Sequence, residues 1–455
     1  MKHLKKSILG LSLVVLSLSA CGPSNSSEDT NDDEDVDITL ASDYEAELSI
    51  LIPNSTKREE TMVDAVIQEF NLKYPKISVV KKFVNVDGWE NTVRNQNIAG
   101  ILPDIVWSNS PDYYFLIDSK IGLNLAPYIR ASEANGDFDF KSDFYTEYFD
   151  MGAKDGKYYC IPRSCDSVVT FYNKNLLSAA GIDTSDIVNG WTWETFLSKL
   201  EAYRQYLDKN GQKTAYCVDM NLYNWLSVPW PILNSYGGTI IDKDLNVTVD
   251  SPETRECLSM IREMVEKRYI PVPGVETTNS FEFGTSPFLF QSSSISLFAD
   301  TALLKGKIDI ASFPLIQDKG TPKIGCGIAG YAINSKTKHK VACWQFLNTM
   351  ISYDGQQAMA TGGLNLPSVR KDLQTIGEAN WTKGYEHLNL SAYTYGSEYK
   401  ITPDFLSWPD PRAKAGLVTA TTDLFYNASR DDKDIEYAIR VCKDEVQDIM
   451  DSVRR

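Results

Sequence analysis

Residues 48–107 read LSILIPNSTKREETMVDAVIQEFNLKYPKISVVKKFVNVDGWENTVRNQNIAGILPDIVW, and this stretch alternates two kinds of pattern. Short apolar runs at 48–52, 77–83 and 104–107 are typical of strands. Between the first two runs, apolar residues recur at helical spacing behind Thr56 and Glu59, which stand three positions apart as in a capping box. A second helix is predicted at 89–99. Strands and helices that alternate in this order predict a parallel sheet with helices on its faces.

Further along the chain, a second α/β unit is predicted. It begins with strand-like runs at 156–162 and 168–172, and Thr192 then stands where an N-cap is expected ahead of Trp193, Phe196 and Leu200. Later elements are predicted by the same patterns: strands at 294–298, 308–313 and 330–333, and helices at 341–350 and 435–453. About 400 residues after the N-terminal region suggest two domains.

The N-terminus has the order of a secretory signal, with lysines ahead of an apolar run at 8–18. That run is too short to span a bilayer, for which about 20 residues are needed. It ends in Leu18-Ser19-Ala20-Cys21, which resembles a bacterial lipobox. We therefore expect residues 1–20 to be a signal peptide, Cys21 to carry a lipid, and the protein to work at the extracytoplasmic face of the cell membrane.

Composition narrows the classes of partner. Residues 22–47 hold ten acidic side chains and no Lys or Arg, so residues 21–47 are predicted to be a disordered tether. The formal net charge is −16, and no basic cluster with interleaved aromatics occurs, which disfavours nucleic-acid binding.

Cysteine and histidine usage gives no sign of metal chemistry. Seven cysteines besides Cys21 are scattered along the chain. An odd and scattered set of cysteines does not indicate a disulfide framework. Cys160 and Cys165 are close enough in sequence to pair, although buried thiols are the simpler interpretation. Three histidines without neighbouring ligands give no support to a zinc site, and no cofactor is implied.

A series of local motifs carries a resemblance to a known family. The motifs are Glu69-Phe70-Asn71, Tyr74-Pro75, Ile98-Ala99-Gly100, Pro103-Asp104-Ile105-Val106, Gly156-Lys157-Tyr158, Ile161-Pro162, Phe171-Tyr172-Asn173-Lys174-Asn175-Leu176-Leu177, Thr192-Trp193-Glu194-Thr195-Phe196, Tyr236-Gly237-Gly238, Phe313-Pro314 and Trp344-Gln345-Phe346-Leu347. No single motif is specific, but in this order and spacing the chain resembles the family 1 extracellular solute-binding proteins. These are the maltose-binding-like receptors of ABC importers, and the resemblance covers nearly all of residues 48–455.

The resemblance implies an α/β, two-lobed, periplasmic-binding-protein-like (type II) fold with a hinge and a ligand cleft between the lobes. The N-terminal lobe would comprise residues 48–165 and 329–375, and the C-terminal lobe residues 166–328 and 376–455. The chain would cross the hinge near 165–168 and again near 324–328. The implied function is capture of a carbohydrate, an oligosaccharide, by a monomer that delivers it to an ABC permease, where the partner uses the ATP.

One departure from the family pattern lies at Gly284-Thr285-Ser286-Pro287-Phe288, where relatives often have Gly-x-x-Ala-Met. It puts in doubt the helix that enters this region. It also puts in doubt the cleft residues that follow, including Asp300.

Ligands of open α/β sheets bind at the carboxyl ends of strands, and this rule sorts the tryptophans. Trp193 and Trp344 have helical spacing and are predicted to be core residues. The tryptophans predicted to stack on a sugar are Trp107 at a strand end, Trp225 and Trp230 in an aromatic loop stiffened by prolines, and Trp408, which lies where the family has a late aromatic contact.

Polar side chains that would bond sugar hydroxyls lie at strand ends and lobe junctions. The candidates are Asn54, Asn109, Arg163, Asp166, Asp300 and Tyr331. For each charged residue the alternative is a solvated surface group or a structural ion pair, and for Tyr331 it is hinge packing.

Other functions stay open at this point. A surface glycoside hydrolase would need two carboxyls about 5–9.5 Å apart, which a sequence does not measure. No Gly-x-Ser-x-Gly, His-Glu-x-x-His or phosphate-loop motif occurs, so the chain is not expected to be an enzyme. Peptides and anions are the rival solutes. An anion site would favour bare helix N-termini and basic side chains over tryptophans, so the aromatic loop favours carbohydrate.

Overall fold

The computed structural model describes residues 35–453 with short gaps, namely 55–56, 87, 110–112, 224, 243, 275–279, 293–294, 375–379, 404, 406–410 and 431–432. The predicted signal peptide and Cys21 lie outside the described residues, and so does Trp408. Residues 35–455 cluster as one unit. Among the described helices, none combines the length and the apolar content needed to cross a membrane.

The first sheet has five strands in the order β2-β1-β3-β13-β6. These are Ile77–Val84, Ala46–Pro53, Ile105–Asn109, Ala329–Ile333 and Ile161–Pro162. β1 runs parallel to both β2 and β3, which confirms the parallel sheet predicted from residues 48–107. β13 returns from far along the chain and pairs antiparallel with β3.

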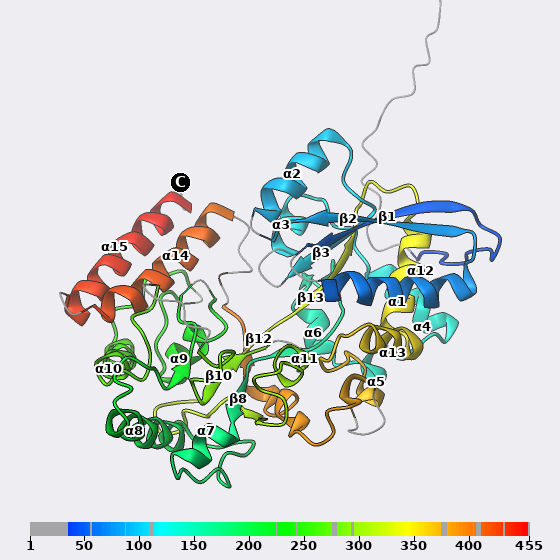
Figure 1. The fold of residues 1–455 in the computed structure, drawn as a ribbon. Coiled ribbons are helices and arrows are strands. Elements are labelled where there is room, and N and C mark those ends of the chain that lie inside the picture. Colours follow the sequence, from blue (N-terminus) through cyan, green and yellow to red (C-terminus); the bar gives the residue numbers. More distant parts are fainter. Residues whose placement is uncertain are drawn as a thin grey trace, which may run out of the picture. The chain divides into compact units, whose positions relative to one another are not determined.

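Helices cover both faces of this sheet (Figure 1). α1 (Lys57–Lys73), α12 (Lys340–Ile351) and α13 (Tyr353–Thr361) pack together on one face, and α2 (Trp89–Ala99) and α3 (Tyr113–Asp118) lie on the other. Both α1 and α2 occur where the apolar spacing predicts them. α4 (Ala126–Asn135), α5 (Phe140–Asp143), α6 (Thr146–Asp150), β4 (Ala153–Lys154) and β5 (Lys157–Tyr158) follow α3 along the chain.

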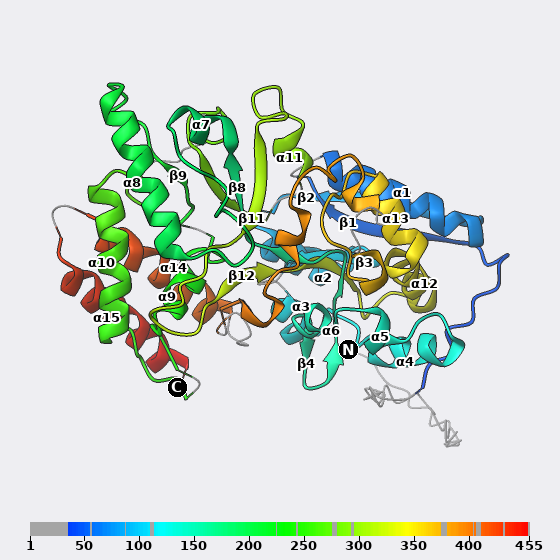
Figure 2. The same cartoon turned by 90° about the horizontal axis from the view of Figure 1, so that it is seen from below.

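The second sheet has four strands in the order β11-β8-β10-β9. These are Ile308–Ser312, Val169–Asn173, Phe288–Gln291 and Val218–Asp219. The helices that accompany this sheet are α7 (Lys174–Ala179), α8 (Trp193–Lys209), α9 (Pro229–Ser235), α10 (Pro252–Glu266), α14 (Pro411–Ala428) and α15 (Ile435–Val453), as Figure 2 shows. Thr192 caps α8 by accepting a hydrogen bond from the Thr195 N–H at 3.1 Å, as predicted.

A small third sheet joins segments far apart in sequence, in the order β14-β12-β7. β7 (Asp166–Ser167) and β12 (Ile324–Gly327) are the two predicted hinge crossings, and they pair antiparallel. β14 (Lys400–Ile401), which the sequence did not predict, pairs with β12. Lys400 Nζ donates to the Tyr148 hydroxyl at 2.7 Å and to the Tyr393 carbonyl at 3.0 Å. The new strand is therefore bonded to α6.

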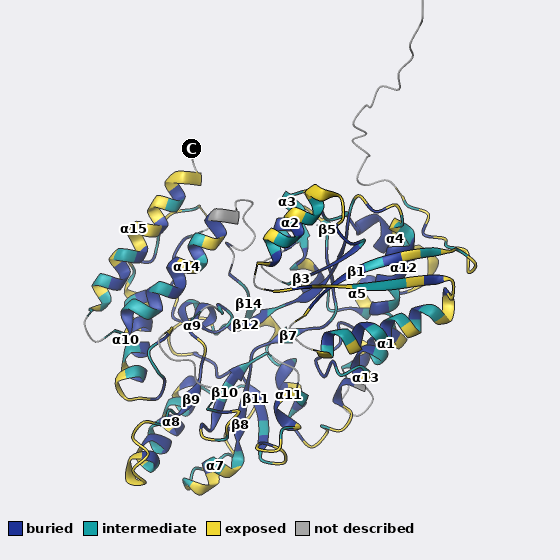
Figure 3. Ribbon diagram, turned by 45° about the horizontal axis from the view of Figure 1, so that its top comes forward, coloured by how far each residue is buried: buried dark blue, intermediate teal, exposed yellow. Residues whose placement is uncertain are grey.

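Each large sheet has its own apolar core, visible as the dark blue strands of Figure 3. Trp344 lies in the first core and Trp193 in the second, which confirms the prediction that both are core residues. The cysteines from 160 onward are all buried and free, so Cys160 and Cys165 do not pair.

Residues 35–45, here called the strap, precede β1 and lie against the first core, although the sequence assigned them to the tether. Ile38 is only 2% exposed, and its carbonyl accepts a hydrogen bond from Gln345 Nε2 at 2.7 Å. The Tyr44 hydroxyl lies 3.0 Å from His339 Nδ1. Val36 and Leu40 also pack on this core.

The strand expected at 294–298 is wrong. The strand of this region is β10, and residues Ser296–Ala299 form the short helix α11. Phe288 and Phe290 are buried with a period of two, whereas Ile295, Phe298 and Ala299 are buried at helical spacing. The remaining elements are the 3-10 helices Lys371–Leu373, Asn380–Thr382, Leu390–Tyr393 and Ser397–Tyr399.

Candidate functional site

Two orphaned polar atoms mark the carboxyl end of the central strand β3. Trp107 is 5% exposed, and its Nε1 has no hydrogen-bond partner in the described structure. The same holds for Asn109 Oδ1, two residues further on. Buried polar atoms are nearly always satisfied, so an orphan pair at the ligand-binding edge of a parallel sheet indicates groups that a ligand satisfies.

Trp107 faces the side of the sheet that α1 covers. It pairs directly with Tyr331 of β13, and directly opposed residues point to the same face. The Tyr331 hydroxyl reaches Glu59 in the first turn of α1, donating to Oε1 at 2.8 Å. The indole of Trp107 and the phenol of Tyr331 therefore lie beside one another under the start of α1.

A chain of polar contacts continues from Glu59 towards the hinge. Arg163 Nε donates to Glu59 Oε1 at 3.2 Å, and Arg163 Nη1 donates to Ser164 Oγ at 2.8 Å. Ser164 Oγ donates in turn to Asp166 Oδ1 at 2.9 Å. Ser164 is fully buried and Glu59 is 6% exposed. Three predicted residues, Arg163, Asp166 and Tyr331, are thus brought together by Glu59 and Ser164, which the sequence did not single out.

The charges of this chain affect one another. Burial raises the pKa of Asp166, while Arg163 and the hydrogen bond from Ser164 oppose that rise. Burial alone would lower the pKa of Arg163, but the carboxylates of Glu59 and Asp166 raise it, so the guanidinium is charged. Burial, together with the charge of Glu59, raises the pKa of Tyr331 well above its usual value, so the phenol stays a hydrogen-bond donor.

Asn54 and Asp300 lie apart from that chain of contacts. Asn54 is exposed at the end of β1, and its N–H donates to the Val84 carbonyl at 2.9 Å. Asp300 follows α11 rather than a strand, and its Oδ2 accepts from the Tyr385 hydroxyl at 2.5 Å. Burial lowers the pKa of Arg58, and Asp300 and Tyr385 oppose this electrostatically, which places all three groups near one another.

The aromatic loop presents its two tryptophans differently. Trp230 is 3% exposed and packs edge-to-face on Phe405, with 5.2 Å between ring centroids. It therefore packs as a core residue in the described structure. Trp225 is only partly buried and packs on the outside of the same core, so its ring is the more accessible of the two.

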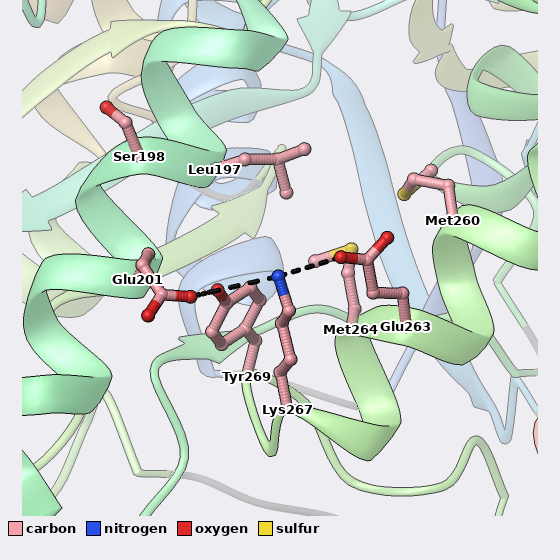
Figure 4. A pocket seen from close by; sticks show the side chains of 8 residues that line it. All are labelled: Leu197, Ser198, Glu201, Met260, Glu263, Met264, Lys267 and Tyr269. Carbon is pink, nitrogen blue, oxygen red and sulfur yellow. Dashed lines mark hydrogen bonds and ion pairs between the residues drawn. The ribbon is translucent and has the colours of Figure 1, made fainter.

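A cavity of about 230 Å³ lies between α8 and α10 and contains none of the predicted site residues (Figure 4). Its polar rim is already paired. Lys267 Nζ lies 2.7 Å from Glu263 and 3.8 Å from Glu201, and the Tyr269 hydroxyl donates to Glu201. A polyhydroxylated ligand would have to compete with these contacts, so we do not assign the site to this cavity. The described residues contain no group of three or more His, Cys, Asp or Glu side chains that could hold a metal ion.

Comparison with known proteins shows the family to which the chain belongs. The sequence profile of the bacterial extracellular solute-binding proteins matches residues 53–357, well over half of the chain. The chain belongs to this family. This solute-binding protein is similar to curated arabinooligosaccharide-binding proteins of Halalkalibacterium halodurans, with 24% identity over 45% of the chain, and of Bacillus subtilis, with 23% identity over 62%. The matches span 46% and 64% of those relatives' own lengths.

Solved structures agree on the fold of this solute-binding protein. An ABC substrate-binding protein of Listeria monocytogenes in complex with cycloalternan has a TM-score of 0.72 at 19% identity, over 90% of this chain and 100% of its own. The sugar-binding protein MalE of Xanthomonas citri has a TM-score of 0.68 at 18% identity, over 90% and 98%. UgpB of Mycobacterium tuberculosis, in complex with glycerophosphocholine, has a TM-score of 0.72 at 16% identity, over 90% and 100%. The two-lobed α/β fold is confirmed, and the UgpB complex shows that this fold does not by itself determine the ligand.

Proposed function

We propose that this protein captures an oligosaccharide between its two lobes and delivers it to the permease of an ABC importer. The observation that carries the proposal is the orphaned pair Trp107 Nε1 and Asn109 Oδ1 at the end of β3. An indole N–H can only donate, whereas an amide oxygen can only accept. A sugar hydroxyl does both, so neighbouring hydroxyls on one ring match this pair.

The ligand in this proposal lies where the two lobes meet. The lobes are residues 48–165 with 329–375 and residues 166–328 with 376–455, and β7 and β12 are the crossings between them. Arg163, Asp166 and Tyr331 would supply charge and hydrogen bonds at this junction, and Asn54, Trp225 and Asp300 are proposed as further contacts. Trp408 is proposed as a further contact from the C-terminal lobe. The names of the curated relatives support an oligosaccharide ligand.

The proposed place of work is the outer face of the cell membrane, with a lipid on Cys21 holding a monomer near its permease. The Leu18-Ser19-Ala20-Cys21 motif supports the anchor. No covalent chemistry is part of the proposal. Oligosaccharides incubated with the protein should therefore keep their chain length, which chromatography of the mixture checks.

A thermal-shift screen tests the proposed ligand class. Residues 22–455, which retain the whole described part of the chain, would be melted with arabinotriose, maltotriose, cycloalternan, glycerophosphocholine and a tripeptide. A ligand that binds only the folded state raises the melting temperature. We expect a rise with at least one saccharide. A rise with glycerophosphocholine or the tripeptide, and with no saccharide, would refute the carbohydrate proposal.

A further inference from the structure

The chain Tyr331–Glu59–Arg163–Ser164–Asp166 has a fixed direction of donation. A guanidinium has only donors, so Ser164 Oγ must accept from Arg163 and must give its own proton to Asp166. A carboxylate has only acceptors, so Glu59 must accept from both Tyr331 and Arg163. Arg163 therefore holds Glu59 on one side and orients Ser164 on the other.

The charge of this chain is unbalanced. Glu59 and Arg163 form a largely buried ion pair, with side chains 8% and 12% exposed, and Asp166 is the excess carboxylate. Asp166 is only partly buried. Its Oδ1 accepts from Ser164, whereas no hydrogen bond within the described part of the chain reaches its Oδ2.

We propose that Glu59 and Arg163 are positioning residues that hold Asp166, through Ser164, in the orientation in which its second oxygen meets a sugar hydroxyl. This inference rests on the proposed function. Neither Glu59 nor Arg163 needs to touch the ligand. Their effect reaches Asp166 by charge and by the fixed direction of the Ser164 hydroxyl.

The other ionisable groups that face Asp166 are neutral at physiological pH. They are Tyr148 of α6, Cys165 before β7, Cys326 of β12 and Tyr393. Burial raises the pKa of each group, to about 12 for Cys326. Lys400 faces Cys165 and Cys326, and burial lowers its own pKa. In the described structure, Glu59 and Arg163 are therefore the charges recorded as acting on Asp166.

The two charges act in opposite directions. Glu59 raises the pKa of Asp166, and Arg163 lowers it. A carboxyl whose pKa is raised in the folded state destabilises the fold once it ionises, since folding then works against its charged form. Asp166→Asn should therefore raise the melting temperature at pH 7.5. The size of that rise in melting temperature measures how strongly Glu59 and Arg163 oppose or favour the charge on Asp166.

The first arm of the test needs no ligand. The gain from Asp166→Asn is measured at pH 7.5 in the native sequence, in Glu59→Gln and in Arg163→Met. We expect the rise in melting temperature caused by Asp166→Asn to be about 1–2 °C smaller in the Glu59→Gln background and larger in the Arg163→Met background. The double variant Glu59→Gln/Arg163→Met removes the ion pair as a whole and replaces Arg163→Met if that variant does not fold. In this double variant, Asp166→Asn should raise the melting temperature by more than it does in Glu59→Gln alone.

Asp64→Asn is the matched control for this arm. Asp64 is a carboxylate of the same helix α1 that lies 2.6 Å from Lys81. Its loss should leave the gain from Asp166→Asn unchanged. Equal gains in all backgrounds would overturn the inference, because they would show that neither charge reaches Asp166.

The second arm measures affinity for arabinotriose and maltotriose by calorimetry between pH 4.5 and 8. Protonation of Asp166 removes an acceptor, so affinity should fall on the acid side. The pH at which affinity falls should be lower in Glu59→Gln and higher in Arg163→Met. At pH 8, Kd should be about fivefold larger in both variants than in the native protein. If the native protein binds a saccharide but Glu59→Gln leaves affinity and its pH profile unchanged, the positioning role is refuted. If it binds none of the screened saccharides, the proposed function fails and the positioning role fails with it, even where the ligand-free arm shows that Glu59 and Arg163 act on Asp166.

Discussion

At the residue scale, Trp107 is the tryptophan that we propose as a ligand contact. Its ring is buried like that of a core tryptophan, yet its N–H has no partner among the described residues. Trp344 is the contrasting case, because its Nε1 donates to Ser132 Oγ at 3.1 Å. An unpartnered N–H does not by itself mark a ligand contact, because the core residue Trp193 also has a buried Nε1 without a partner among the described residues. What distinguishes Trp107 is its place at the carboxyl end of β3, beside Asn109.

Trp107→Phe should weaken saccharide binding about fivefold to tenfold, since a hydrogen bond contributes about 1 kcal/mol net. It should leave the melting temperature of the unliganded protein unchanged or slightly raised, because it removes an unsatisfied donor. Calorimetry and differential scanning fluorimetry measure the two effects. Trp344→Phe is the control, which should lower the melting temperature and leave affinity alone. A loss of stability without a loss of affinity in Trp107→Phe would contradict the ligand role.

Asp104 stabilises the sheet through a charged acceptor. Its Oδ2 accepts from the Ser49 N–H at 2.8 Å and from Ser49 Oγ at 2.7 Å, and its Oδ1 accepts from Thr337 Oγ1 at 2.6 Å. Burial would raise the pKa of Asp104, but the hydrogen bonds from Thr337 and Ser49 outweigh it and lower the pKa below 3.8. The ionised form is thus the one that the fold favours.

Asp104→Asn should cost about 1–2 kcal/mol of unfolding free energy at pH 7. A carboxyl whose pKa is lowered in the folded state contributes stability above its unfolded pKa, and that contribution is lost as pH falls through the folded value. The difference between the native protein and Asp104→Asn should therefore shrink below about pH 4. Urea unfolding at several pH values measures it. A difference that is constant down to pH 3 would refute the charged role.

At the scale of elements, local patterns predicted the fold best where they were strong. The strands and helices of residues 48–107 were predicted nearly to their ends, because buried parallel strands and amphipathic helices have distinct periods. α11 was missed because a four-residue helix is too short to show its period. Glu59 was missed as a network residue because its partners lie 104 and 272 positions away, and nothing local signals them.

The strap shows where amino-acid composition fails to predict order. Its acidic residues predict disorder, but Ile38 is buried in the first core, and Val36 and Leu40 pack against it. The strap precedes β1 and so lies towards the amino ends of the parallel strands, whereas the proposed site lies at their carboxyl ends. The two should be independent.

Ile38→Asp should detach the strap, lowering the melting temperature through the loss of about 2 kcal/mol of apolar burial. It should also speed proteolytic cleavage within residues 35–45 and leave saccharide affinity unchanged. Leu72→Asp is the control, since Leu72 of α1 is 79% exposed and its replacement should change none of these readouts. Unaltered cleavage in Ile38→Asp would mean that the strap is not held by Ile38.

At the scale of the whole molecule, the resemblance predicted the two-lobed fold, and residue patterns did not. The strand β14 comes from a stretch without a strong period, and it pairs with β12 from far along the chain. We propose that the lobes close on an oligosaccharide at the end of β3, where Trp107 and Asn109 supply a donor and an acceptor that have no partner among the described residues.

Calorimetric titration of the protein with arabinotriose, maltotriose and glycerophosphocholine tests that claim most directly. We expect saturable heat at a single site with at least one of the two oligosaccharides, and none with glycerophosphocholine. Saturable binding of glycerophosphocholine, with no heat from either oligosaccharide, would contradict it.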